Sequence, residues 1–271
     1  MARIGVFDSG YGGLTILEKF RALLPEYDYV YLGDNARTPY GTRSFEVVYQ
    51  YTLECVKKLF ELDCDLVILA CNTASAKALR TIQQKDLPLI APNKRVLGVI
   101  RPTAEKVGEF TKSLHVGLLG TEGTIQSGSY PMEINKIFPE IVVTGQACPM
   151  WVPLIENGEH LSEGADYFVK KYISNLLSAD PMIDTLILAC THYPLLVDKI
   201  KMHAPKHMQI ISQGPIIADR LKDYLLRHPE METRLSKNGE CIFYTTESVD
   251  KFKKSASAFL KENIEAHHIT L

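Results

Sequence analysis

VILACNTA at residues 67–74 and LILACTHY at residues 186–193 decide the fold, because each is an apolar run that ends in Ala-Cys and continues with polar residues. Short, nearly continuous apolar runs are typical of parallel strands that are buried on both faces. The polar residues that follow favour the start of a helix. Each phrase therefore predicts a cysteine, Cys71 or Cys190, at the carboxyl end of a strand and beside a helix N-terminus.

Short apolar runs alternate with amphipathic stretches along nearly the whole chain. We predict strands at residues 4–7, 29–32, 66–70, 116–119 and 241–244, and helices at residues 12–24, 46–62, 215–227 and 248–260. This alternation is typical of βαβ units, in which helices cover both faces of a parallel sheet. The predicted fold is α/β, with two pseudo-symmetric, doubly wound domains, mostly parallel sheets, and an active site in the cleft between them.

Two features of the sequence suggest where the domains divide. LPLIAPNKRVLG at residues 87–98 carries two prolines and two charged residues, and the strand–helix alternation restarts after it. IGVFDSGYGG from Ile4 resembles VGLLGTEGT from Val116, as the two LAC phrases resemble each other, which indicates an internal duplication. The C-terminal stretch is longer than the second half needs to form a sheet that matches the first. We therefore expect a first domain of residues 1–99 plus 209–271 and a second domain of residues 100–208.

Composition and charge limit the classes of function. The 271 residues are 46% hydrophobic, enough to fill two cores, and 30 Lys and Arg nearly balance 32 Asp and Glu. Without a block of basic residues interleaved with aromatics, we expect no nucleic-acid partner. No apolar run approaches the roughly 20 residues that a membrane span needs, and the N-terminus carries no targeting pattern. We expect a cytoplasmic protein that does not associate with a membrane.

The six cysteines are scattered, at positions 55, 64, 71, 148, 190 and 241, in a chain that does not need disulfides for stability. Reduced thiols are therefore expected. Cys190 and His192 have no second ligand pair at the spacing of a zinc site, so we expect no metal. A thiol at a helix N-terminus has its pKa lowered from about 8.5 toward neutrality. We predict this of Cys71 and Cys190, and we expect the other four thiols to be small buried hydrophobic groups.

Neutral polar residues surround the two cysteines in the predicted loops. Hydroxyls, an amide and N–H groups at helix starts can bind carboxylates without a cationic side chain. Taken singly, such residues are also common helix caps, so only their convergence at strand ends is informative. The candidate binding residues are Asp8, Ser9, Tyr40, Gly41, Asn72, Thr73, Thr121, Thr191 and His192.

Two matched thiols across a carboxylate-binding cleft suit the inversion of a stereocentre. One group removes a proton from one face of a carbon, and the other delivers a proton to the opposite face. Such acid–base work needs one thiolate and one thiol, and Asp8, Glu156 and His192 are candidates to set which is which. The predicted catalytic residues are therefore Cys71 and Cys190 with these three supporting groups.

Nearly the whole chain resembles the cofactor-independent aspartate/glutamate racemase superfamily, and most closely its glutamate racemases. The resemblance rests on IGVFDSGYGGL from Ile4, YLGDNARTPYG from Tyr31, ACNTASA from Ala70, CPMWVPLIE from Cys148, LILACTHYPLL from Leu186 and FYTTES from Phe243. It implies interconversion of L- and D-glutamate without pyridoxal phosphate, metal or nucleotide, to supply D-glutamate for peptidoglycan and the cell wall. By this resemblance Cys71 acts on D-glutamate and Cys190 on L-glutamate, and the enzyme is a homodimer. The absence of a G-x-G-x-x-G or P-loop pattern agrees.

The sequence departs from the family pattern in three places. Residues 98–103 read GVIRPT where the family usually has GVIEPG, and PNKR before them resembles an insertion. Residues 212–214 read SQG in place of a more common DSG, and Ala189 stands where glycine is frequent. None of these changes removes a predicted catalytic residue.

Three other functions stay open at this point. A related superfamily enzyme acting on aspartate, a hydantoin or a maleate-like diacid would use the same polar residues with a different pocket length. A non-catalytic protein that senses an amino acid would not need both thiols, and both are present. A thiol hydrolase needs one nucleophilic cysteine with a base and an oxyanion hole, which leaves the second cysteine without a role.

Overall fold

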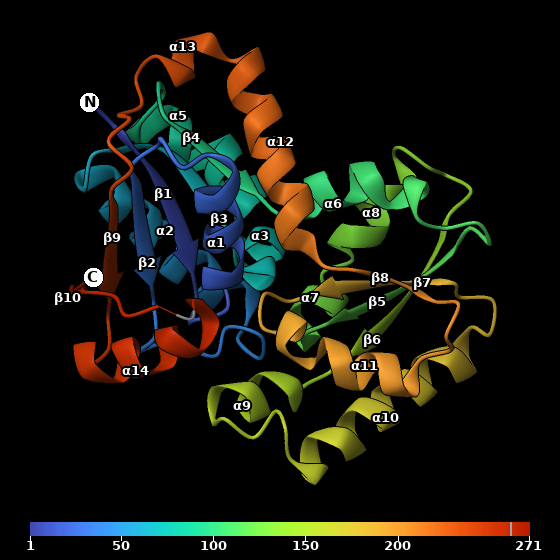
Figure 1. The fold of residues 1–271 in the computed structure, drawn as a ribbon. Helices are drawn as coiled ribbons and strands as arrows, with labels where there is room; N and C mark the ends of the chain where they lie inside the picture. Colours follow the sequence, from blue (N-terminus) through green and yellow to red (C-terminus); the bar gives the residue numbers. More distant parts are fainter. Residues whose placement is uncertain (261) are drawn as a thin grey trace.

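The computed structural model describes residues 1–260 and 262–271, which form two parallel β-sheets covered by helices (Figure 1). The first sheet has the order β10-β9-β2-β1-β3-β4 and the second the order β6-β5-β7-β8. Every pairing between neighbouring strands is parallel. The predicted α/β class with two doubly wound, parallel sheets is therefore confirmed.

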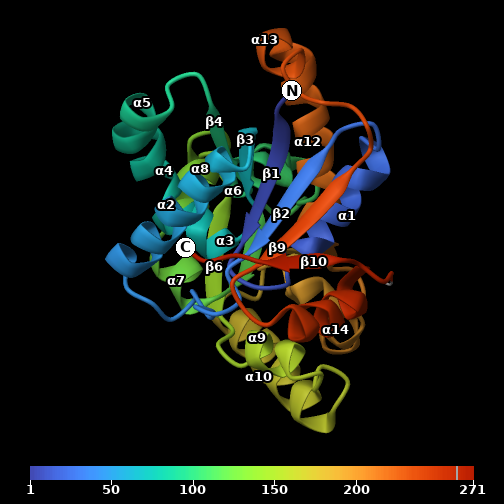
Figure 2. The same ribbon diagram turned by 90° about the vertical axis from the view of Figure 1, so that its left-hand side faces the viewer.

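The six-stranded sheet takes strands from both ends of the chain. Its strands are β1 (Arg3–Asp8), β2 (Tyr29–Gly33), β3 (Cys64–Leu69), β4 (Arg95–Gly98), β9 (Cys241–Thr245) and β10 (Ala266–His268). The C-terminal strands β9 and β10 extend the sheet beside β2 (Figure 2). The four-stranded sheet comprises β5 (His115–Gly120), β6 (Val142–Ala147), β7 (Thr185–Ala189) and β8 (Gln209–Ile211).

Helices cover both faces of each sheet. The described α-helices are α1 (Leu14–Leu23), α2 (Phe45–Glu61), α3 (Asn72–Lys77), α4 (Leu79–Thr81), α5 (Leu87–Ile90), α6 (Ile100–Lys106), α7 (Glu122–Gln126), α8 (Ser129–Asn135), α9 (Trp151–Glu156), α10 (Glu163–Ala179), α11 (Val197–His203), α12 (Gln213–Arg227), α13 (Pro229–Glu232) and α14 (Val249–Leu260). A π-helix spans Ile82–Asp86, and 3₁₀ helices span Val107–Glu109 and Tyr193–Leu196.

The sequence pattern explains the central strands and the two longest helices. The central strands β2 and β7 are buried along their whole length, as their continuous apolar runs predict. In α2 the buried residues recur every three or four positions, and the hydroxyl of Ser44 accepts a hydrogen bond from the Val47 N–H as an N-cap. Ser162 caps α10 in the same way.

Helix α12 connects the two halves of the molecule. It packs against α1 beside the six-stranded sheet and against α6 beside the four-stranded sheet (Figure 1). One buried apolar cluster extends from Ile4 and Val6 of β1 to Leu186 and Leu188 of β7. The halves are therefore joined by a packed interface as well as by the chain.

The predicted domain division at residues 99/100 and 208/209 stays a prediction. The strand that begins at Gln209, β8, pairs with β7 in the four-stranded sheet, because Gln209–Ile211 continues the parallel register of Thr185–Ile187. The stretch at residues 87–98, interpreted from its prolines and charges as a boundary, contains helix α5 and strand β4, and β4 pairs with β3.

Candidate active site

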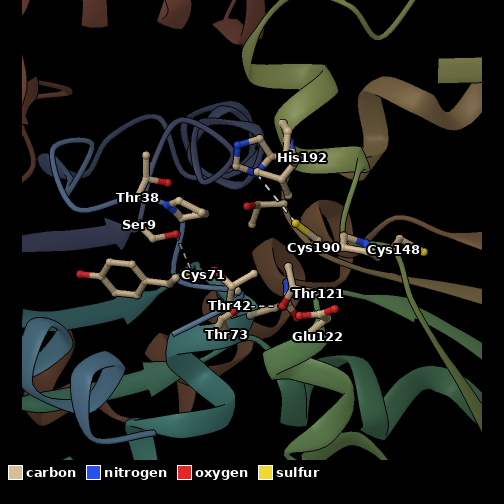
Figure 3. Close-up of a pocket in the computed structure, with 18 residues that line it drawn as sticks. Ser9, Thr38, Thr42, Cys71, Thr73, Thr121, Glu122, Cys148, Cys190 and His192 are labelled. Carbon is tan, nitrogen blue, oxygen red and sulfur yellow. Dashed lines mark hydrogen bonds between the residues drawn. The ribbon is translucent and has the colours of Figure 1, made fainter. Parts of the chain in front are cut away.

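A small cavity lies where the carboxyl ends of β1, β3, β5 and β7 approach one another (Figure 3). Its volume is about 80 Å³. A water molecule needs about 10–15 Å³ on the same measure, so the cavity has room for a handful of waters or one small organic molecule. The residues that line it are Ser9, Thr38, Pro39, Tyr40, Gly41, Thr42, Cys71, Asn72, Thr73, Thr121, Glu122, Cys148, Pro149, Val152, Pro153, Cys190, Thr191 and His192.

Cys71 enters the cavity from the six-stranded sheet. It follows β3 directly and is the N-cap of α3, where its sulfur accepts a hydrogen bond from the Ala74 N–H at 3.5 Å. The Ser9 hydroxyl lies 3.3 Å from the same sulfur. Burial raises the pKa of the Cys71 thiol to about 12, and the negative charge of Asp8 adds to this, outweighing the two hydrogen bonds. The predicted lowering of this pKa is wrong, because α3 is only six residues long and the thiol is fully buried.

Cys190 enters the cavity from the four-stranded sheet in a different setting. The predicted helix start is present, but the residues after Cys190 first form a 3₁₀ helix, Tyr193–Leu196, which leads into α11. The Cys190 sulfur lies 3.8 Å from Nδ1 of His192, a contact that Figure 3 marks with a dashed line. The other ring nitrogen of His192, Nε2, lies 3.1 Å from Oε1 of Glu156.

His192 is buried, and its two contacts favour the protonated imidazole. Burial alone lowers its pKa, but the hydrogen bonds and negative charges of Cys190 and Glu156 raise the pKa to about 10. Glu156 does not line the cavity, and its carboxylate contacts the His192 ring. An imidazolium between a sulfur and a carboxylate can donate a hydrogen bond to each of them.

Asp8 also lies behind the cavity lining. Its Oδ1 accepts from the Thr191 hydroxyl at 3.4 Å, and its Oδ2 accepts from the Gly10 N–H at 2.9 Å. Burial raises the pKa of Asp8 even though the nearby charge of His192 and the backbone N–H groups lower it. Asp8 thus links β1 to the loop that carries Cys190.

Gly12 allows these two loops to meet. A Cβ atom at this position would lie 2.3 Å from Oγ1 of Thr191 and 2.4 Å from Nδ1 of His192. Any side chain here would push the Cys190 loop away from β1, so the close approach depends on glycine.

The other predicted binding residues reach the cavity with different groups. The hydroxyls of Thr73 and Thr121 lie 2.9 Å apart, and Thr121 also caps α7. Tyr40 lines the cavity, but its hydroxyl donates to Oδ2 of the buried Asp34. Gly41 contributes backbone, and its carbonyl accepts from the Gly123 N–H. Ten of the twelve predicted site residues line the cavity, whereas Asp8 and Glu156 lie behind it.

Sequence reasoning missed eight residues of the lining, which are Thr38, Pro39, Thr42, Glu122, Cys148, Pro149, Val152 and Pro153. Most of them lie within the phrases YLGDNARTPYG and CPMWVPLIE, next to residues that were predicted. The sequence indicated these residues only by their position in the two phrases. No lining residue of this cavity is a lysine or an arginine.

Within residues 1–260 and 262–271, no group of three His, Cys, Asp or Glu side chains is arranged to hold a metal ion. None of the helices described is both long and apolar enough to span a membrane.

Comparison with known proteins yields consistent matches. The family model described as Asp/Glu/Hydantoin racemase matches residues 14–221. The glutamate racemase of Geobacter metallireducens is 40% identical over 257 residues, which cover 95% of this chain and 92% of that protein. The crystal structure of a glutamate racemase isoform from Bacillus anthracis matches with a TM-score of 0.90 and 35% identity, covering 100% of this chain and 98% of the other. The glutamate racemase of Francisella tularensis in complex with D-glutamate matches with a TM-score of 0.88 and 32% identity, covering 99% of this chain and 97% of the other.

Proposed function

The chain belongs to the Asp/Glu/Hydantoin racemase family, and from this membership we infer that its cavity interconverts L- and D-glutamate. The protein is a glutamate racemase, an isomerase that supplies D-glutamate for peptidoglycan synthesis. The observation that carries the assignment to this cavity is that Cys71 from one sheet and Cys190 from the other both line a single small pocket. The third cysteine of the lining, Cys148, donates its thiol hydrogen to the Gln146 carbonyl.

We propose that Cys71 and Cys190 transfer protons on opposite faces of Cα. With L-glutamate, the Cys190 thiolate removes the Cα proton and the Cys71 thiol donates its proton to the other face. The products are D-glutamate, a Cys190 thiol and a Cys71 thiolate, and the reverse reaction starts from that form. Each step moves one proton and leaves the total charge of the site unchanged, as general acid–base catalysis by a matched pair requires.

The surroundings of the two sulfurs support this starting state. The pKa of Cys71 near 12 keeps it a thiol at neutral pH, ready to donate. Protonated His192 beside Cys190 complements negative charge on that sulfur. We infer that the resting enzyme is ready to act on L-glutamate and that Asp8, His192 and Glu156 maintain this charge distribution.

The polar lining supports the binding of the substrate's two carboxylates. Its hydroxyl, amide and backbone donors come from Ser9, Asn72, Thr73, Thr121, Thr191 and the Tyr40–Gly41 segment. These groups are neutral, so they can bind a dicarboxylate without adding a charge close to Cα.

A racemisation assay tests the function directly. The purified protein is mixed with L- or D-glutamate, and circular dichroism follows the signal, which we expect to decay to zero from either enantiomer. Aspartate serves as the discriminating substrate, and we expect no decay with it. A steady glutamate signal in both directions, or faster decay with aspartate, would overturn the assignment.

A cytoplasmic location and a homodimer are part of the proposal. The mechanism needs reduced thiols, all six cysteines are free in the described structure, and the cytosol keeps thiols reduced. Light scattering coupled to size-exclusion chromatography would test the dimer, with a mass near twice the 30.4 kDa of the chain expected.

A further inference from the structure

Asn72, the residue after Cys71, belongs to a closed ring of three hydrogen bonds. Its Nδ2 donates to Oε1 of Gln213 at 2.7 Å, Nε2 of Gln213 donates to the Tyr130 hydroxyl at 2.5 Å, and that hydroxyl donates to Oδ1 of Asn72 at 2.6 Å. Each side chain donates one bond and accepts one within the ring. A head-to-tail arrangement of this kind strengthens every bond in it.

The ring joins elements that belong to different parts of the fold. Asn72 begins α3 after β3, Tyr130 lies on α8 over the four-stranded sheet, and Gln213 begins α12, the helix between the two halves. Nε2 of Gln213 makes a further bond at 2.8 Å to the hydroxyl of Thr103 on α6. Gln213 therefore connects the loop of Cys71 to two helices on the opposite half.

All members of the ring are buried. The exposed fractions are 2% for Asn72, 4% for Gln213 and 0% for both Tyr130 and Thr103. A buried amide left without partners costs about 1–3 kcal/mol, and this cost disfavours any arrangement that breaks the ring. The Asn72 amide uses its oxygen and one of its two N–H hydrogens in the ring, and Asn72 also lines the cavity.

We propose that Gln213 and Tyr130 are positioning residues, which hold the Asn72 carboxamide and the start of α3 in the geometry that the Cys71 half-site needs. Neither residue lines the cavity, so both act through Asn72. The inference rests on the racemase function proposed above. A misplacement of about 1 Å at a reacting centre can cost about 100-fold in rate, so loosening the ring should lower the catalytic rate of a variant that is still folded.

Gln213→Glu is the sharpest test, because a carboxyl group restores the ring only when it is protonated. A protonated carboxyl can accept from Asn72 and donate to Tyr130, whereas a carboxylate can only accept. We expect the ratio of variant to wild-type kcat/KM to fall by at least about tenfold between pH 6 and pH 9, reaching a loss of roughly 10- to 100-fold at the upper end. Tyr130 is the ionisable side chain that bonds residue 213, and Cys190 contributes to the raised pKa of Tyr130. Both groups are also present in the wild type, so their own titration is shared by the two proteins whose kcat/KM values form the ratio.

Gln83→Glu is the matched control. Gln83 is exposed, donates to the Val96 carbonyl at 2.7 Å and lies outside the cavity, so the same charge change should leave the ratio flat. Equal, flat ratios for the two glutamate variants would overturn the positioning role. Because the wild type is measured in the same assay, a wild type without racemase activity would instead refute the proposed function.

Tyr130→Phe keeps the inference testable if the carboxyl variant does not fold. It removes one oxygen while keeping the ring shape, and thermal unfolding verifies that each variant is folded at the assay temperature. We expect kcat/KM to fall about tenfold, since the Asn72 oxygen loses its donor and the bond is worth about 1.4 kcal/mol at that ratio. A folded Tyr130→Phe variant with wild-type kcat/KM in both directions would contradict the proposal.

Discussion

The Cys71 and Cys190 half-sites share a sequence phrase but differ in what surrounds the sulfur. Cys71 caps a short helix, touches the Ser9 hydroxyl and has its pKa raised to about 12 by burial and by Asp8. Cys190 precedes a 3₁₀ helix and touches His192, whose second nitrogen contacts Glu156. The repeat in the sequence thus produces one neutral half-site and one ionic half-site.

In the two-thiol mechanism proposed above, this difference gives unequal surroundings to two groups that exchange roles in each turnover. A thiol held neutral is a ready acid, and a sulfur beside an imidazolium is a ready base. The asymmetry lies in the partners and not in the strands that carry the cysteines. Substitution of a partner residue should therefore affect one half-site more than the other. Substitution of either cysteine should stop racemisation in both directions.

Replacement of either cysteine should have the largest effect. We expect Cys71→Ser and Cys190→Ser each to lower racemisation by about 10³-fold or more, because each removes the group that the proposed mechanism assigns to one face of Cα. Circular dichroism in both directions measures the loss. A single variant that keeps activity within tenfold of wild type would show that one thiol is sufficient.

His192→Asn should lower kcat/KM by roughly 100-fold, because it removes the cation that complements charge on Cys190. The two enantiomers have equal energy, so kcat/KM must fall equally in both directions while the separate kcat values can diverge. His203→Asn is the control, since His203 makes a similar contact, at 3.0 Å to Asp166, far from the cavity. A loss of kcat/KM below threefold would show that His192 does not stabilise charge on Cys190.

Glu156→Gln should shift the pH profile more than the maximal rate. The Glu156 hydrogen bond and charge help to raise the pKa of His192 to about 10, so the imidazolium is lost as pH rises through that value. Without the carboxylate this pKa falls, and the high-pH limb of kcat/KM should move to lower pH. We expect a loss of about fivefold to twentyfold at pH 9 and a smaller loss at pH 7. A limb that stays in place would mean that Glu156 does not support His192.

Ser9→Ala should have the smallest effect. The Ser9 hydroxyl lowers the pKa of Cys71 through a 3.3 Å contact, and losing it should reduce kcat/KM by about threefold to tenfold, the worth of one hydrogen bond. Ser236→Ala is the matched control, because its buried hydroxyl bonds the Ala2 carbonyl away from the cavity. Equal activity of the two variants would show that this contact does not tune Cys71.

The sequence predicted the strands that carry the site because their signals are local. The apolar runs before Cys71 and Cys190 and the polar turns after β1 and β5 fix which residues follow strand ends. Among the strands that were not predicted, β4 lies in the stretch interpreted as a domain boundary, β6 has no buried residue and β10 has only three residues. Their pairing is decided by neighbouring strands and not by their own pattern.

The electrostatics of the site could not be predicted from the sequence. The raised pKa of Cys71 depends on complete burial and on Asp8, a residue far away in the chain. The ring that holds Asn72 joins residues 72, 130 and 213, and its donors are decided by packing between the two halves. The Tyr40 hydroxyl bonds Asp34, an outcome that the motif containing both residues did not indicate.

Solvent deuterium exchange at Cα in the single cysteine variants tests the two-thiol mechanism most directly. In D₂O, the Cys71→Ser variant should exchange the Cα proton of L-glutamate and spare D-glutamate, because only Cys190 remains to remove a proton. The Cys190→Ser variant should show the opposite preference, and more slowly, because Cys71 starts as a thiol. Proton NMR follows the loss of the Cα signal. Exchange of both enantiomers by one variant at equal rates would contradict the assignment of one thiol to each face.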